Sequence, residues 1–265
     1  MTTAATEAGP LRGVHRNVAH VMGMPISLAL RGLHVDDERA ESAWQGCLAV
    51  LQAADRMFST YRHDSVVSRL QRGDVDVADC PAEVLEVLEL GERARRESHG
   101  AFDVRRPGPD GHLVLDPSGV VKGWAVARAA GALDPLPGTD YCLSAGGDMV
   151  CRTQRTGAPP WRIGIEDPHD PGRVVAVVPV HNGAVATSGL ARRGAHIVDA
   201  RTGTTPGDVA SVTVLGPDLV WADIDATAAF ALGGDALSWL RGRSGHSGLV
   251  VWADGTREVF GPTTP

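Results

Sequence analysis

Lys122 is the single lysine of the chain, and its surroundings suit the binding of an anion. The ammonium of lysine is a compact point charge with three donors, whereas the guanidinium of arginine is a planar fork, so the two are not interchangeable at a phosphate. The preceding Asp116-Pro117-Ser118-Gly119 is typical of a turn, and a helix that begins after such a turn favours anions at its N-terminus. The pattern therefore predicts a phosphate site at Lys122. The alternative is an ordinary surface lysine at a helix start.

Asp223 and Thr227 are four residues apart at the start of the last predicted helix, and they therefore share one helix face, while Asp225 points elsewhere. One carboxylate, one hydroxyl and nearby carbonyl oxygens suit Mg²⁺, which keeps several waters and often contacts substrate phosphates. The pattern predicts a magnesium site. The alternative is that Asp223 only stabilises the helix start, as acidic residues there commonly do.

Two further side chains are candidates for chemistry or ligand binding. His196 lies at the edge of a predicted strand, close in sequence to Thr187 and Ser188, and an imidazole with a reference pKa of about 6.5 can act as a general base. The alternative is a purely structural histidine. Tyr61 is one of only two tyrosines and lies in a polar loop, where it could stack on a planar ligand. The alternative is a partly buried anchor.

Composition excludes several classes of protein. A net charge of −7 leaves no basic footprint for nucleic acid, and no stretch is apolar enough for a signal peptide or a membrane anchor. The four cysteines lack the spacing of metal or redox motifs, so we expect reduced thiols and a cytoplasmic location. The common nucleotide-binding and hydrolase motifs are absent from the sequence.

The elements that must position these residues change in kind halfway along the chain. A loosely alternating pattern predicts an early strand over 20–33, and helical spacing of apolar residues then predicts helices over 36–57, 81–98 and 122–133. Alternating patterns between turn residues predict strands over 141–144, 161–165, 174–180, 185–187, 196–198, 210–215 and 248–253. A helical region over 220–241 is interrupted at Gly233-Gly234. We expect a flexible tail over 1–15 and one compact α+β unit, with helices mainly in the first half and mostly antiparallel strands in the second.

Eight short motifs occur in one order between about Val21 and Gly234. They are Met22-Gly23, Ser59-Thr60-Tyr61-Arg62 with Asp64-Ser65, Gly100-Ala101-Phe102-Asp103, Asp116 with Lys122-Gly123, Gly146-Gly147-Asp148, Ala186-Thr187-Ser188-Gly189, His196-Ile197-Val198-Asp199 with Arg201-Thr202-Gly203, and Ala222-Asp223 with Ala226-Thr227. Each motif is weak alone. Together they make the chain resemble the FAD:protein FMN transferases of the ApbE family.

The resemblance implies one ApbE-like domain over 16–265, related to the T-fold. It implies an enzyme that binds FAD and Mg²⁺, transfers FMN to a Thr or Ser hydroxyl of an acceptor protein through a phosphoester bond, and releases AMP. The implied FAD site consists of Met22, Tyr61, Ala101, Phe102, Asp103, Asp116, Lys122 and Ile197. The implied Mg²⁺ ligands are Asp223 and Thr227, with backbone oxygens of Gly119 and Ala226. The implied catalytic residues are Lys122, Asp223 and, as the base for the acceptor hydroxyl, His196.

Three departures from the family pattern bear on these expectations. Many members are exported lipoproteins with a lipid-bearing cysteine, whereas the first cysteine here is Cys47, inside a predicted helix. Met24 replaces the usual threonine of Met-Gly-Thr. Only Leu190–Ala195 separate Gly189 from His196, where the family often has a longer loop, and this shortening bears on acceptor recognition. Two alternatives stay open, an Mg²⁺-dependent FAD pyrophosphatase and a non-catalytic FAD-binding protein.

Overall fold

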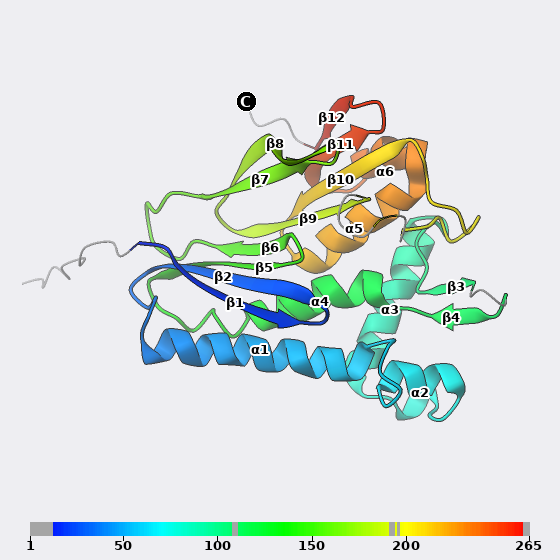
Figure 1. The fold of residues 1–265 in the computed structure, drawn as a ribbon, viewed down its shortest axis with the longest axis horizontal. Coiled ribbons are helices and arrows are strands. Elements are labelled where there is room, and N and C mark those ends of the chain that lie inside the picture. The colour runs from blue at the N-terminus through cyan, green and yellow to red at the C-terminus, as the bar shows by residue number, and fades with distance from the viewer. Residues whose placement is uncertain (1–12, 108–110, 191–193, 195–196, 262–265) are drawn as a thin grey trace, which may run out of the picture.

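The computed structural model describes residues 13–107, 111–190, 194 and 197–261, and at its centre lies an eight-stranded sheet (Figure 1). The strands follow the order β1-β2-β5-β6-β9-β10-β11-β12, and every neighbouring pair is antiparallel. Their bounds are His15–Val21 (β1), Met24–Gly32 (β2), Thr139–Ala145 (β5), Asp148–Arg152 (β6), Gly183–Gly189 (β9), Val209–Gly216 (β10), Ser247–Trp252 (β11) and Arg257–Phe260 (β12).

Helices cover one face of this sheet. They are α1 (Glu38–Phe58), α2 (Val66–Arg72), α3 (Ala82–Glu97), α4 (Ser118–Ala130), α5 (Leu219–Leu232) and α6 (Ala236–Arg241), with short 3₁₀ turns at Val77–Asp79 and Gly233–Asp235. Inward residues of the strands, such as Leu28, Leu143 and Val212, share the main apolar core with the helices. Among the described residues, no helix combines the length and apolar character needed to cross a membrane.

A separate hairpin covers the other face. Strands β7 (Trp161–Asp167) and β8 (Asp170–Val180) pair with each other and lie above the middle of the sheet in Figure 1. Their apolar side chains pack on side chains of β5, β6 and β9–β11 that point away from the helices. A second small hairpin, β3 (Arg105–Pro107) with β4 (Leu113–Leu115), projects near α3. The middle of the sheet is therefore buried between a helical layer and a β-hairpin.

Helix α5 is apolar on nearly every side because it is surrounded on nearly every side. It packs against α4 and against strands β9 and β10. Asp218 caps its N-terminus by accepting the backbone N–H of Trp221. Asp223 lies more than one turn further on and is buried, so the alternative that Asp223 merely caps the helix does not hold.

The predicted α+β class with mostly antiparallel strands is confirmed, whereas three local predictions are wrong. The strand over 20–33 is instead the β1–β2 hairpin, whose two-residue turn has Met22 at φ 55° and Gly23 at φ 68°. The third helix begins at Ser118, so Lys122 lies in its second turn and not at its start. No strand includes the described residues 197 and 198, and only Asp199 forms an isolated bridge, with Thr204.

Gly123 allows α4 to approach α5 closely. A methyl group there would lie 2.9 Å from the Asp223 Cβ and 2.9 Å from the Leu219 carbonyl oxygen. We expect Gly123→Ala to lower the free energy of unfolding by about 1–3 kcal/mol, because the two helices must separate. Gly46→Ala in α1 is the matched control, since its methyl group would meet only the Ala132 Cβ, at 3.3 Å. Equal losses in urea unfolding of the two variants would contradict this account.

Candidate functional site

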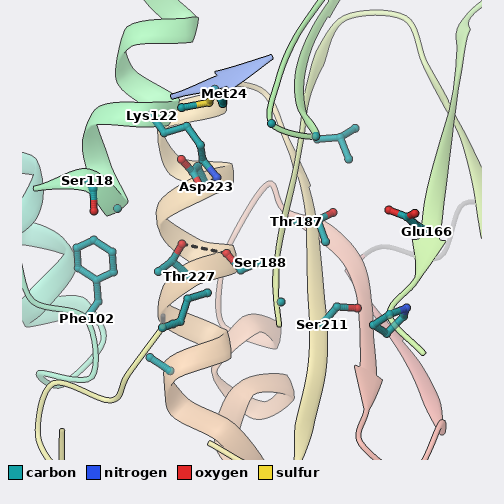
Figure 2. A pocket seen from close by; sticks show the side chains of 18 of the residues that line it. Met24, Phe102, Ser118, Lys122, Glu166, Thr187, Ser188, Ser211, Asp223 and Thr227 are labelled. Carbon is teal, nitrogen blue, oxygen red and sulfur yellow. Dashed lines mark hydrogen bonds and ion pairs between the residues drawn. The ribbon is translucent and has the colours of Figure 1, made fainter. Parts of the chain in front are cut away.

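A cavity of about 520 Å³ opens where the central sheet is incomplete. Strand β6 pairs with β9 only at Gly183–Val185, so the rest of β9 has β10 on one side and no strand from the described part of the chain on the other. Side chains of α4 and α5 line the cavity on one side of β9, and β7 lines it on the other (Figure 2). The cavity is thus a product of the short β6 strand and of the hairpin that covers the gap.

Most of the site residues implied by the sequence meet in this cavity. It is lined by Ala101, Phe102, Asp103, Asp116, Gly119, Lys122, Ile197, Asp223 and Thr227. Three others are not among the described lining residues. Met22 lies in the β1–β2 turn next to the lining residues Gly23 and Met24, Tyr61 is 98% exposed, and Ala226 is fully buried. His196 lies outside the described residues, so its role as a base stays a prediction.

The ammonium of Lys122 lies between two buried carboxylates. Its Nζ atom is 2.5 Å from Asp148 Oδ2 and 3.1 Å from Asp223 Oδ1. The other oxygen of Asp223 accepts the backbone N–H of Gly123 at 2.9 Å. Burial disfavours the ammonium, but the two carboxylates outweigh burial and raise the pKa of Lys122 above its usual value. Burial likewise raises the pKa of Asp223, against the opposing effect of the ammonium. Lys122 is therefore a fixed cation and not a mobile surface side chain.

Oxygen atoms suited to a hard cation lie beside this cluster. Asp223 and Thr227 face the cavity one helical turn apart, and Thr227 Oγ1 lies 3.0 Å from Ser188 Oγ on β9 (Figure 2). The described residues contain no group of three His, Cys, Asp or Glu side chains that could hold a metal. A site with one carboxylate, hydroxyls and open cavity volume matches the way Mg²⁺ binds, with waters and phosphate oxygens completing its shell. The donor set therefore fits Mg²⁺.

The part of the cavity wall formed by Phe102 and Asp116 combines an aromatic ring with a polar edge. The Phe102 ring stands against Gly119, where a methyl group would come within 3.0 Å of the ring. Asp116 accepts hydrogen bonds from the backbone of Ser118 and from the guanidinium of Arg106, which lies 2.8 Å away. Burial raises the pKa of Asp116, but these donors outweigh burial and hold it below its usual range. A flat apolar wall beside an ionised carboxylate suits a planar ring that carries polar groups.

Several residues that line the cavity or lie directly behind its lining had no role assigned from the sequence. Asp148 was visible only as the last residue of a Gly-Gly-Asp turn, and Thr187 and Ser188 only as part of a motif and as hydroxyls close in sequence to His196. The hairpin contributes Ile163, Ile165 and Glu166, for which the sequence carries no signal beyond strand periodicity. These side chains join the site through strand pairing between distant segments, which local patterns do not reveal.

Removing the ammonium should destabilise the fold. We expect Lys122→Ala to lower the free energy of unfolding by about 3–5 kcal/mol, because Asp148 and Asp223 would be left buried without their cation. Arg106→Ala is the control, because it breaks an ion pair whose arginine side chain is half exposed and should cost about 0–1 kcal/mol. Urea unfolding measures both. A loss no larger for Lys122→Ala than for the control would show that the cluster does not stabilise the fold.

Comparison with known proteins agrees with this architecture. A sequence model of the ApbE family matches residues 22–107 and 105–250. The FAD:protein FMN transferase of Haemophilus influenzae is 27% identical over 247 residues, covering 71% of each chain, and that of Klebsiella pneumoniae is 26% identical, covering 75% of this chain and 73% of the relative.

Two solved structures share the fold. The ApbE protein of Thermotoga maritima superposes with a TM-score of 0.80 at 20% identity, covering 94% of this chain and 97% of that one. The apo flavinyl transferase ApbE of Pseudomonas stutzeri superposes with a TM-score of 0.77 at 23% identity, covering 95% and 96%. The matched family model spans most of the chain, in agreement with the resemblance seen in its motifs. The chain belongs to the ApbE family.

Proposed function

We propose that this chain is an Mg²⁺-dependent FAD:protein FMN transferase, which moves FMN from FAD to a Thr or Ser hydroxyl of an acceptor protein and releases AMP. Its sequence relatives carry the name FAD:protein FMN transferase. The observation that carries the proposal is the meeting of Lys122 with the oxygen atoms of Asp223 and Thr227 in one large cavity. A cation beside a hard-metal donor set is what the splitting of a diphosphate requires.

The reaction exchanges the phosphoanhydride link of the FAD diphosphate for a phosphoester link to the acceptor. The acceptor hydroxyl oxygen bonds to the FMN phosphorus, the bond from that phosphorus to the bridging oxygen breaks, and AMP leaves with the bridging oxygen. The hydroxyl proton passes to a base, for which His196 is our candidate. Lys122 would contact the diphosphate and stabilise the charge that grows on the departing AMP phosphate. Such reactions depend mainly on positioning and charge neutralisation.

The metal site is the second part of the proposal. Asp223 and Thr227 would hold Mg²⁺, with backbone oxygens of Gly119 and Ala226. When bound, Mg²⁺ would neutralise the diphosphate and orient it for in-line attack. Ser188, which shares a hydrogen bond with Thr227, would keep that hydroxyl oriented.

The remaining predicted residues would bind the rest of FAD. Ala101, Phe102 and Ile197 offer an apolar wall, and Asp103 and Asp116 offer polar groups at its edge. A further pair, Met22 and Tyr61, are not among the lining residues and would contact only a part of FAD that projects from the cavity. The cytoplasmic location expected from the sequence stays a prediction.

A transfer assay tests the function directly. The purified protein is incubated with FAD and Mg²⁺, with and without an acceptor protein of a related ApbE enzyme, and intact mass and AMP are measured. We expect the acceptor to gain the mass of one FMN with one AMP released, and EDTA to abolish both until Mg²⁺ is restored. AMP and free FMN without modification of the acceptor would instead identify a pyrophosphatase. FAD that stays whole throughout would identify a binding protein.

The role of Asp223 has its own test. We expect Asp223→Asn to raise the Mg²⁺ concentration for half-maximal transfer by at least about tenfold, because the metal loses its charged ligand. Asp225→Asn is the matched control on the same helix, since Asp225 faces away and pairs with Arg243 at 2.8 Å and His246 at 2.6 Å. A Mg²⁺ titration of each variant, corrected for folded protein, separates the two roles. Unchanged metal dependence in Asp223→Asn would remove this residue from the metal site.

A further inference from the structure

Asp148 joins the ion cluster to the incomplete part of the sheet. Its side chain is about 1% exposed at the start of β6, and its two oxygens have different partners. Oδ1 accepts the backbone N–H of Thr187 at 2.9 Å, and Oδ2 lies 2.5 Å from Lys122 Nζ. Thr187 lies two residues beyond the last residue of β9 that pairs with β6. The Asp148 carboxylate therefore accepts a backbone hydrogen bond of β9 at a position where β6 no longer pairs with it. One of its oxygens is held by the Thr187 N–H and the other by the Lys122 ammonium.

Asp148 and Asp223 differ in their access to the cavity. Among the described residues Asp223 lines the cavity and Asp148 does not, although both contact Lys122. A divalent cation in the cavity would be within reach of Asp223 and would compete with the ammonium for that carboxylate. Two carboxylates and one ammonium leave one excess negative charge for the cation. The Asp223 carboxylate is available to the cation only if a second carboxylate holds the Lys122 ammonium in its place.

We propose that Asp148 is a positioning residue that retains Lys122 while Asp223 is released to the metal. The proposal rests on the function proposed above and adds a residue to its machinery. With Asp148 present, the ammonium keeps a buried, fixed counterion when Asp223 turns to Mg²⁺, and it stays beside the diphosphate. Without the Asp148 charge, Asp223 is the only carboxylate of the described residues within ion-pair distance of Lys122, so the ammonium occupies the site of the metal.

Asp148→Asn tests this role, because asparagine keeps the shape and an oxygen that can accept the Thr187 N–H. Binding of Mn²⁺, in place of Mg²⁺, is measured by electron paramagnetic resonance in the absence of FAD, so the readout does not depend on turnover. We expect the Kd for Mn²⁺ to rise by at least about tenfold. Asp140→Asn is the matched control: Asp140 is fully buried on β5 and paired with Arg31 and Arg155, but it is not among the cavity-lining residues. It should lose stability and leave Mn²⁺ binding unchanged.

A double variant separates competition by Lys122 from a general loss of structure. Lys122→Met combined with Asp148→Asn removes one charge of each sign, so no buried carboxylate other than Asp223 is left in the cluster and the competing ammonium is gone. We expect Mn²⁺ affinity to return to within about threefold of the wild-type value, although transfer stays slow. A purely structural role of Asp148 predicts no such rescue.

The outcomes distinguish this inference from the proposed function. Weakened Mn²⁺ binding in Asp148→Asn with rescue in the double variant supports the positioning role. Wild-type-like Mn²⁺ binding in Asp148→Asn, an equal loss in Asp140→Asn, or no rescue overturns it while leaving the transferase activity of the wild type intact. A wild-type protein that binds no Mn²⁺ and transfers no FMN overturns the proposed function itself, and this role with it.

Discussion

The ammonium of Lys122 between Asp148 and Asp223 is the interaction on which the site depends. Two carboxylates that are almost completely buried are tolerable only if a cation and hydrogen bonds compensate for their lost hydration. The three residues come from α4, β6 and α5, so the ion cluster forms only when these three elements pack. The folding of the core and the assembly of the site are therefore one process.

Close packing of α4 on α5 is the second requirement. Gly123 leaves room for Asp223, and its backbone N–H donates to the carboxylate, so the same residue supplies both space and a hydrogen bond. Helix α5 then carries Thr227 one turn further along the cavity. Because β6 is short, β9 has β10 on one side beyond Val185 and, among the described residues, no strand on the other. This gap becomes the cavity because the β7–β8 hairpin covers its far side. An incomplete sheet thus supplies a binding volume inside an otherwise continuous core.

The sequence predicted the long helices and the α+β class because these depend on local patterns. Helix α1 shows apolar periodicity, and the Gly233-Gly234 interruption marks the end of α5. Local patterns failed where the backbone adopts a conformation that is rare for the residue type. The β1–β2 turn requires a positive φ at Met22, a conformation that only a few per cent of non-glycine residues adopt. Met22 therefore gives no signal for this turn, and the alternation of apolar residues over 20–33 predicted a single strand. The short elements α2, β6 and β12 were missed because few residues carry their pattern.

Part of the candidate site could be predicted because two of its residues are unusual in the sequence. Lys122 and Asp223 stood out by rarity and by spacing, and the cavity brings both together with Phe102 and Asp116. The pairing of Lys122 with Asp148 was not predictable from spacing, because it depends on which strand lies beside α4 in the folded chain. The exposure of Tyr61 likewise follows from the position of its loop and not from its own sequence context.

A crystal structure with FAD and Mn²⁺, with anomalous scattering to locate the metal, tests the central claim most directly. We expect one Mn²⁺ about 2.1 Å from an oxygen of Asp223, coordinated by Thr227 and a diphosphate oxygen, with Lys122 still paired to Asp148 and facing the diphosphate. A metal bound elsewhere in the cavity, or a diphosphate distant from an unbroken Lys122–Asp223 pair, would contradict it.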